Sequence, residues 1–346
     1  MNDERTWYRS TDPAPGVARS LRRIARDVLR SWLPVPDVQD ATVVVCSRQT
    51  WPKLTRRGLR SEFHGFFSEF QSVLGALAFA GAQSAVAVRV DFRSPLYVEP
   101  ERGSNWWTYF FRDAVIPVGP ARTSAREVRL DGVITKYGRY GGFADVVQGL
   151  TPYLYPMTFG IDRCELHRLA SRVPVRPEIA DEVARLKTSL FVPGAFVVAV
   201  HYRGTDAQHN WTGGLTHYRK THVPYAVYAD EVRRVLERAA PRDYQVFVAT
   251  DERDCFEFMR REFAGRMIGL ADAPRASAGG QAVHLDRGMP VSRYEKGKSA
   301  LVDSLLLASG DYLVKGRSNL SDASLVFSPS LPYSFLPDVP LPRAAL

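Results

Sequence analysis

The sequence predicts an α/β protein of two domains, each built around a mostly parallel sheet. The chain has 346 residues, which exceeds the roughly 150–250 residues over which a single core grows efficiently. Its second half alternates helical and strand patterns, and its first half holds a strand–helix–strand unit. Apolar residues make up 45% of the chain and charged residues 24%, as in ordinary globular proteins.

The first half opens its βαβ unit with two buried-strand patterns, Ala41–Val45 and Ala85–Val90. The segment between them predicts a long helix, with Gly65 near its start. Its apolar residues recur at helical spacing: Phe63, Phe66, Phe67, Phe70, Val73, Leu74 and Leu77.

An aromatic cluster follows the second of these strands. Trp106, Trp107, Tyr109, Phe110 and Phe111 lie within six positions of one another. We expect them to pack in the core. The alternative is an exposed platform for an acceptor sugar, because sugars stack on aromatic faces.

Prolines in Ser171–Pro177 separate two strongly periodic regions, so we place the domain boundary there. The predicted domains are residues 1–172 and 173–330, both Rossmann-like, followed by a proline-rich tail over 331–346 without regular structure.

The second half predicts a doubly wound, mostly parallel sheet, because helices and strands alternate along it. In chain order the elements are helix Glu178–Leu190, strand Phe196–Val200, helix Tyr225–Ala239, strand Tyr244–Val248, helix Arg253–Phe263, strand Arg266–Leu270, helix Lys298–Ala308, strand Asp311–Val314 and a helix from about Ser318.

Charge and targeting patterns restrict the class of protein. The net charge is +9, but the basic residues are dispersed, so we expect no nucleic-acid partner. Val17–Leu33 predicts a basic amphipathic helix, either packed on the body or in peripheral contact with an anionic membrane. No bilayer-spanning stretch or signal peptide is visible, which predicts a cytoplasmic protein. The three scattered cysteines predict buried free thiols.

Polar residues follow three predicted strands of the second half. His201, Arg203, Gly204 and Asp206 end the first of these strands, Asp251 ends the second, and the fourth leads into Lys315–Asn319. Since ligands of parallel sheets lie beyond the carboxyl ends of the strands, we expect these groups to form one site.

The residue types in this predicted site suit a nucleoside diphosphate. Arginine forks bind phosphate oxygens, a glycine permits close approach, carboxylates bind ribose or base, and hydroxyls begin a helix. The structural alternatives are an ion pair between Arg203 and Asp206 and a helix-capping role for Asp251.

The segments His201–Asp206, Ala249–Asp251 and Lys298–Ser321 resemble the motifs of the nodulation-type and core α-1,6-fucosyltransferases, relatives of the protein O-fucosyltransferases. The resemblance covers roughly the second half of the chain, and the first half only loosely. It implies a GT-B architecture, an inverting mechanism without a metal, and a GDP-fucose donor held mainly by the second domain.

The resemblance also implies roles for individual residues. Arg203 falls on the arginine that binds the β-phosphate, and Asp251 and Asp303 fall on the carboxylates that hold guanosine. The donor-binding set, including the phosphate-contacting turn, is His201, Arg203, Gly204, Asp251, Asp303, Arg317, Ser318 and Asn319.

The chain departs from the family at two positions. Gly204 stands where the core enzymes carry a second arginine. The position of the family's acidic residue, proposed as the general base, falls near Trp211 in this chain. Candidates for a base are His209, Asp206 and Glu69, with Arg203 as the residue that stabilises the leaving diphosphate.

No D-x-D motif for Mg²⁺ or Mn²⁺ is visible, so we expect neither a metal nor a cofactor. Arg203, with Lys315 and Arg317, would take the place of the ion. The nucleotide-sugar donor is then the small-molecule partner, and the acceptor is a glycan, a protein or a small metabolite.

Other classes of protein fit less well. Glu295–Ser299 resembles the end of a phosphate-binding loop, but Ser292 replaces the required glycine. No G-x-S-x-G elbow of a serine hydrolase is present, and the histidines His209, His217 and His222 lack zinc-ligand spacing. Two alternatives stay open: a transferase for another nucleotide sugar, and a non-catalytic nucleotide- or sugar-binding protein.

Overall fold

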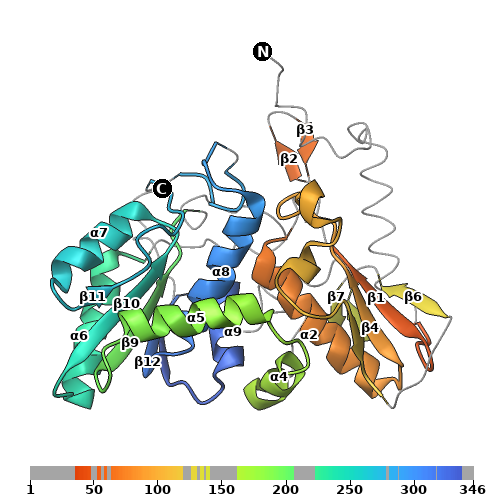
Figure 1. Cartoon of the computed structure of the whole chain (residues 1–346), viewed down its shortest axis with the longest axis horizontal. Coiled ribbons are helices and arrows are strands. Elements are labelled where there is room, and N and C mark those ends of the chain that lie inside the picture. The colour runs from red at the N-terminus through yellow and green to blue at the C-terminus, as the bar shows by residue number, and fades with distance from the viewer. Residues whose placement is uncertain are drawn as a thin grey trace.

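A computed structural model of the chain describes residues 36–47, 64–119, 126–130, 162–205, 223–277, 280–286, 288–316 and 318–336, with the backbone of four short strands between 53 and 140. The predicted helix Val17–Leu33 lies outside these residues. Two α/β halves lie side by side, each with its own sheet (Figure 1).

The sheet of the first half has the strand order β5-β4-β1-β6. Strand β1 pairs in parallel with β4 on one side and with β6 on the other, whereas β5 pairs antiparallel with β4. Two short hairpins, β2–β3 and β7–β8, accompany it. The bounds are β1 Thr42–Cys46, β2 Lys53–Thr55, β3 Gly58–Arg60, α2 Phe66–Ala82, β4 Ala87–Asp91, η2 Pro100–Arg102, η3 Trp106–Tyr109, β5 Val115–Pro117, β6 Glu127–Leu130, β7 Val133–Thr135 and β8 Gly138–Tyr140.

Helix α2 is almost wholly buried, as expected for an apolar helix that crosses from β1 to β4. It begins directly after Gly65, whose backbone is extended. The predicted aromatic cluster packs beside it: Trp107 stacks on Phe111, with ring centroids 4.0 Å apart. Trp106 and Trp107 are 0% exposed. The cluster is therefore core, and the alternative of an exposed acceptor platform is wrong.

The sheet of the second half is wholly parallel, with the order β11-β10-β9-β12-β13. This confirms the predicted alternation of helices and strands. The bounds are α4 Arg163–Ala170, α5 Pro177–Leu190, β9 Phe196–Tyr202, α6 Tyr225–Ala239, β10 Tyr244–Thr250, α7 Arg253–Glu262, β11 Met267–Ile268, α8 Arg293–Leu307, β12 Tyr312–Lys315, α9 Asn319–Phe327 and β13 Tyr333–Phe335.

Helix α8 begins five residues earlier than predicted. Ser292 caps it by accepting a hydrogen bond from the Glu295 N–H at 3.1 Å. The serine and the glutamate three positions later form a helix-start signature that the sequence reading overlooked. As a result Lys296 lies inside the helix and is only 9% exposed.

The proline-rich tail was also predicted wrongly in part. Its residues Tyr333–Phe335 form β13, which pairs in parallel with β12, and Leu331 and Leu336 are buried. Strand β13 can pair in parallel with β12 because helix α9 forms the crossover connection between them. The sequence of these three residues alone does not predict that pairing.

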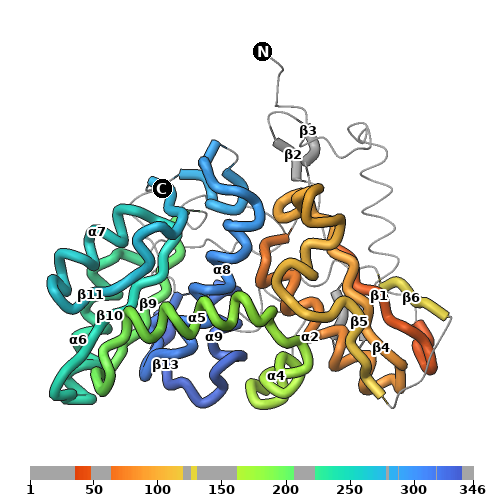
Figure 2. The backbone as a smooth tube through the Cα atoms, viewed as in Figure 1, coloured from red at the N-terminus to blue at the C-terminus, as the bar shows by residue number. Residues whose placement is uncertain are grey.

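The two halves share one hydrophobic core. Helix α4 packs between α2 and α9 (Figure 2), and Phe70 of α2 contacts Phe327 of α9 with ring centroids 5.4 Å apart. Val175, in the predicted linker, forms a β-bridge with Phe111 of the first half. The segment Ser171–Pro177 is therefore packed against the first half rather than a free tether.

All three cysteines are free thiols, as predicted, but Cys164 is exposed and only Cys255 is fully buried. Burial raises the pKa of the Cys255 thiol. Among the residues that the structure describes, no helix is both long and apolar enough to cross a bilayer.

Candidate functional site

The predicted site lies at the carboxyl edge of the five-stranded sheet. Strand β9 is two residues longer than predicted, and His201 is paired in register with Ala249 of β10 and with Lys315 of β12. Parallel pairing therefore brings the three polar strand ends to one edge, which confirms that the sheet gathers them.

His201 is buried at 5% exposure, and its Nδ1 has no hydrogen-bond partner among the described residues. Burial, together with the neighbouring charges of Arg203 and Lys315, lowers the pKa of His201 to about 3. The imidazole is therefore neutral at physiological pH. Its neutrality avoids a third positive charge beside two cations.

Lys315 is also buried, at 2% exposure. Its ammonium forms an ion pair with Asp322 of α9 and lies 5.6 Å from the ring centroid of Phe335. The nearby start of α9 is capped by Ser318, whose Oγ accepts from the Leu320 N–H at 3.3 Å, and Asn319 is the first helical residue. The start of α9 thus follows Lys315, the register partner of His201, and a helix N-terminus favours an anion, while the charge of Lys315 is paired with Asp322.

Asp251 holds the turn that follows β9. Its Oδ1 accepts the Gly204 N–H at 3.0 Å, and its Oδ2 accepts the Thr205 hydroxyl at 2.6 Å. Thr205 is completely buried. Asp251 therefore fixes the backbone beside Arg203, and the alternative in which it caps α7 is wrong because that position belongs to Glu252.

Glu252 was missed by the sequence reading, although it directly follows Asp251. It is 0% exposed, and its Oε2 accepts the Tyr225 hydroxyl at 2.8 Å. Its carboxylate occupies the space where a side chain at Gly204 would begin. We expected Gly204 to admit a phosphate, but the glycine instead accommodates Glu252, which is a correction.

Asp303 lies on α8 and is half-buried. Removal from water raises the pKa of Asp303 to about 7, while the charge of Arg275 opposes the rise. Arg275 was not predicted as a site residue. Its guanidinium donates to the Leu270 carbonyl at 2.7 Å and lies 3.7 Å from the ring centroid of Phe256.

The remaining predicted residues divide into two groups. Asp206, His209 and Arg317 lie outside the described residues. Arg203 is described and half-buried beside His201. Glu69 lies in the first turn of α2, in the other half of the chain, and is 0% exposed. Such burial argues against contact between Glu69 and an acceptor.

These features define a class of protein: a parallel α/β protein with a cationic, partly buried site at the carboxyl edge of one sheet, with a carboxylate on the adjoining helix. Buried cations suit phosphate groups, and a carboxylate suits the donor edge of a nucleobase. The site is therefore suited to a nucleoside diphosphate.

Comparison with known proteins gives structural likeness only. No protein-family profile matches the chain, and no curated protein matches its sequence. A structure of NodZ α-1,6-fucosyltransferase soaked with GDP-fucose is similar, at 16% identity and a TM-score of 0.49, over 84% of this chain and 94% of that chain. POFUT1 in complex with GDP is 11% identical, with a TM-score of 0.42, over 87% of this chain and 99% of that chain.

A variant of FUT1 from Arabidopsis thaliana in complex with GDP is 12% identical, with a TM-score of 0.46, over 95% of this chain and 76% of that chain. The described chain is thus similar to fucosyltransferase structures of three kinds. At these identities and TM-scores the likeness concerns the fold, and the activity has to be argued from the residues of this chain.

Proposed function

We propose that the chain is a glycosyltransferase of GT-B architecture that transfers a sugar, fucose from GDP-fucose, to a hydroxyl acceptor with inversion and without a metal ion. The observation that carries the proposal is a buried, neutral His201 at a parallel-sheet edge, where the positive charges of Arg203 and Lys315 both act on it. A diphosphate would supply the negative charge that this edge favours.

In the proposed complex the diphosphate lies against Arg203 and the start of α9, and the base lies against Asp303. Guanine presents two adjacent N–H donors on one edge, which a carboxylate accepts together. Arg275 keeps part of the Asp303 population charged, since its positive charge opposes the rise in the Asp303 pKa. Asp251 contributes by holding the turn that carries Arg203.

The chemistry of the proposed transfer needs charge stabilisation at the leaving group. As the bond from the anomeric carbon to the diphosphate breaks, the sugar approaches an oxocarbenium ion and the diphosphate gains negative charge. A guanidinium fixed by a rigid strand stabilises that charge without reorganisation, an effect worth about 3–4 kcal/mol. The acceptor hydroxyl attacks from the opposite face, and its proton passes to a base, for which Asp206 and His209 are the candidates.

The main rival function is nucleotide-sugar binding without turnover. The absence of an acidic residue near Trp211, where the related enzymes have one, favours it. A second rival is transfer from a different nucleotide sugar.

Calorimetric titration of the full chain with GDP, UDP and TDP, followed by GDP-fucose, tests the proposal. We expect GDP to bind at least tenfold more tightly than UDP or TDP, and slow hydrolysis of GDP-fucose to follow. Tight binding with no hydrolysis or transfer would support the non-catalytic rival, and binding of none of the three nucleotides would refute the proposal.

A further inference from the structure

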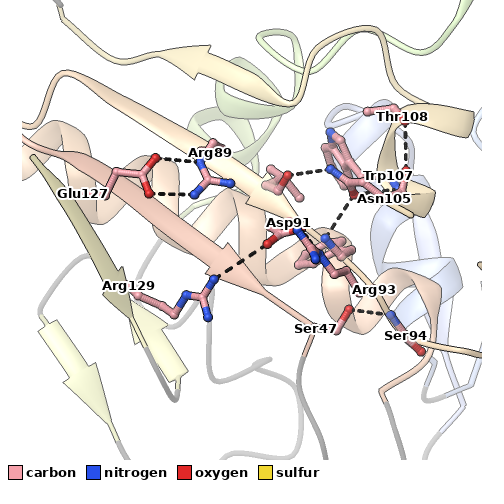
Figure 3. A network of polar contacts seen from close by, with 12 residues as sticks. Ser47, Arg89, Asp91, Arg93, Ser94, Asn105, Trp107, Thr108, Glu127 and Arg129 are labelled. Carbon is pink, nitrogen blue, oxygen red and sulfur yellow. Dashed lines mark hydrogen bonds and ion pairs between the residues drawn. The ribbon is translucent and has the colours of Figure 1, made fainter. Parts of the chain in front are cut away.

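The carboxyl edge of the first sheet carries a second polar cluster, formed by Asp91, Arg93 and Arg129 (Figure 3). Asp91 ends β4, Arg93 follows two residues later, and Arg129 lies near the end of β6. In register, Cys46 of β1 stands beside Asp91, and Val44 stands between Arg89 and Arg129. The cluster therefore straddles the carboxyl ends of three parallel strands.

This edge is also the point at which the strand order reverses. From β1 the chain first adds β4 on one side of the sheet and later adds β6 on the other. Ligands of parallel sheets bind in the crevice outside such a point, because the connecting loops there diverge. The hydrogen bond from the Ser94 N–H to Ser47 Oγ, at 3.0 Å, ties the two diverging segments together.

Positive charge exceeds negative charge in this cluster. Within the described part of the chain, Asp91 is the one carboxylate that contacts both guanidiniums: Arg93 Nε lies 2.7 Å from Oδ1, and Arg129 lies 3.8 Å from Oδ2. Arg89 is already satisfied, since it forms a two-pronged contact with Glu127 at 3.0 and 2.8 Å.

The two arginines are open to a ligand, whereas the carboxylate is not. The side chains of Arg93 and Arg129 are 68% and 62% exposed, and that of Asp91 is 10% exposed. A mostly buried Asp91 contacts Arg93 through Nε, so the two terminal nitrogens of that guanidinium take no part in this ion pair. Such a fork matches the paired oxygens of a carboxylate, sulfate or phosphate.

The same edge adjoins the half that carries the proposed donor site. The segment that follows Arg93 reaches α8: the Tyr294 N–H donates to Glu99 at 2.8 Å, and Arg293 donates to the Val98 carbonyl at 3.0 Å. The Arg102 guanidinium also lies 3.8 Å from the Tyr294 ring centroid. Helix α8 in turn carries Asp303.

We propose that Arg93 and Arg129, oriented by Asp91, bind an anionic group of the acceptor, so that the acceptor is an acidic glycan or other anionic molecule rather than a neutral one. The identification of the bound anion as part of an acceptor rests on the proposed transferase function. The anion site itself stands on the geometry of the first sheet alone.

The test is calorimetric titration of the full chain, saturated with GDP so that the donor site is filled, at low ionic strength. The probes are inorganic sulfate, inorganic phosphate and glucuronate, with glucose as the neutral control. The variant is Arg93→Gln/Arg129→Gln, and the matched control is Arg242→Gln, which removes one exposed arginine from the second half. The two single variants serve if the double variant does not fold.

We expect at least one anion to bind the wild-type protein. The double variant should weaken that binding at least tenfold and each single variant at least threefold, whereas Arg242→Gln should leave it unchanged. The anion bound most tightly identifies the acidic group. The proposal is overturned if the wild type binds none of the anions or if the variants bind as the wild type does. GDP affinity, measured first on each protein, reports separately on the donor proposal.

Discussion

The carboxylate of Glu252 lies directly against the α-carbon of Gly204, so that a methyl group at position 204 would overlap it, with Oε1 at 2.7 Å. Both groups are buried, and Glu252 Oε2 also accepts a hydrogen bond from the Tyr225 hydroxyl at 2.8 Å. The turn that carries Arg203 therefore depends on a missing side chain.

Gly204→Ala should accordingly displace this turn. Overpacking of a well-packed site typically costs about 1–3 kcal/mol, so we expect a lower melting temperature and at least tenfold weaker GDP binding. Gly119→Ala is the control, because a methyl group there would meet only the Ala85 carbonyl oxygen at an ordinary 3.7 Å. Normal GDP affinity in Gly204→Ala would show that the Glu252 contact does not position the site.

Arg203→Ala should reduce turnover about a hundredfold or more, because one preorganised charge on the leaving group is lost. Arg203→Lys should also be severely impaired, since lysine keeps the charge but loses the two-pronged geometry. We expect little change in melting temperature for either variant. Kinetics, GDP affinity and melting are measured on the same preparation, and normal turnover in the alanine variant would refute the catalytic role.

Asp303 should make GDP binding depend on pH. Its pKa is raised to about 7, and only the charged carboxylate accepts two N–H donors from guanine. GDP affinity should therefore fall about tenfold as the pH drops by about one unit below that pKa. Asp303→Asn is the control, because it removes this dependence and leaves the titration of the GDP phosphates.

Stability should change with pH in the opposite sense. The folded-state pKa of Asp303 lies above the model value of 3.8, so the folded protein keeps this proton where the unfolded chain has lost it. The contribution of Asp303 to the free energy of unfolding should therefore decrease as the pH rises from about 4 to about 7. Urea unfolding of wild type and Asp303→Asn across this range measures the difference, and parallel curves would contradict the assignment.

Asp251→Ala should raise the donor Michaelis constant about tenfold or more. The substitution removes both acceptors that fix Gly204 and Thr205, and a lost hydrogen bond to a charged group costs about 1.5–3 kcal/mol. Thr205→Val removes one of the two and should have a smaller effect. Equal donor Michaelis constants in the wild type, Asp251→Ala and Thr205→Val would show that Asp251 does not position the donor site.

Chelation with EDTA should leave the proposed transfer unchanged, because the sequence contains no D-x-D motif and the cations of the site are arginine and lysine. The measurement is the rate of GDP-fucose turnover before and after chelation, with Mn²⁺ added back. A loss that Mn²⁺ restores would exclude the metal-free mechanism.

The sequence alone was sufficient for the parallel sheet of the second half. Its strands are continuous apolar runs and its helices are amphipathic, so the local pattern predicts which segments are helices and which are strands. Helix α6 was predicted at its observed bounds. The rule that strand ends form the site also needed no coordinates, since it follows from parallel pairing. It placed His201, Arg203, Asp251 and Lys315 correctly at one edge.

Only the tertiary structure decided which partners these residues have. The pairing of Gly204 with Glu252 and the approach of Arg275 to Asp303 join segments that are 48 and 28 positions apart, and no local pattern encodes such contacts. Packing also decided between the two readings of the aromatic cluster, because the burial of Trp106 and Trp107 excluded the exposed platform. Local propensity fixes the type of an element, whereas the contacts and the dielectric surroundings of a side chain depend on how distant elements pack.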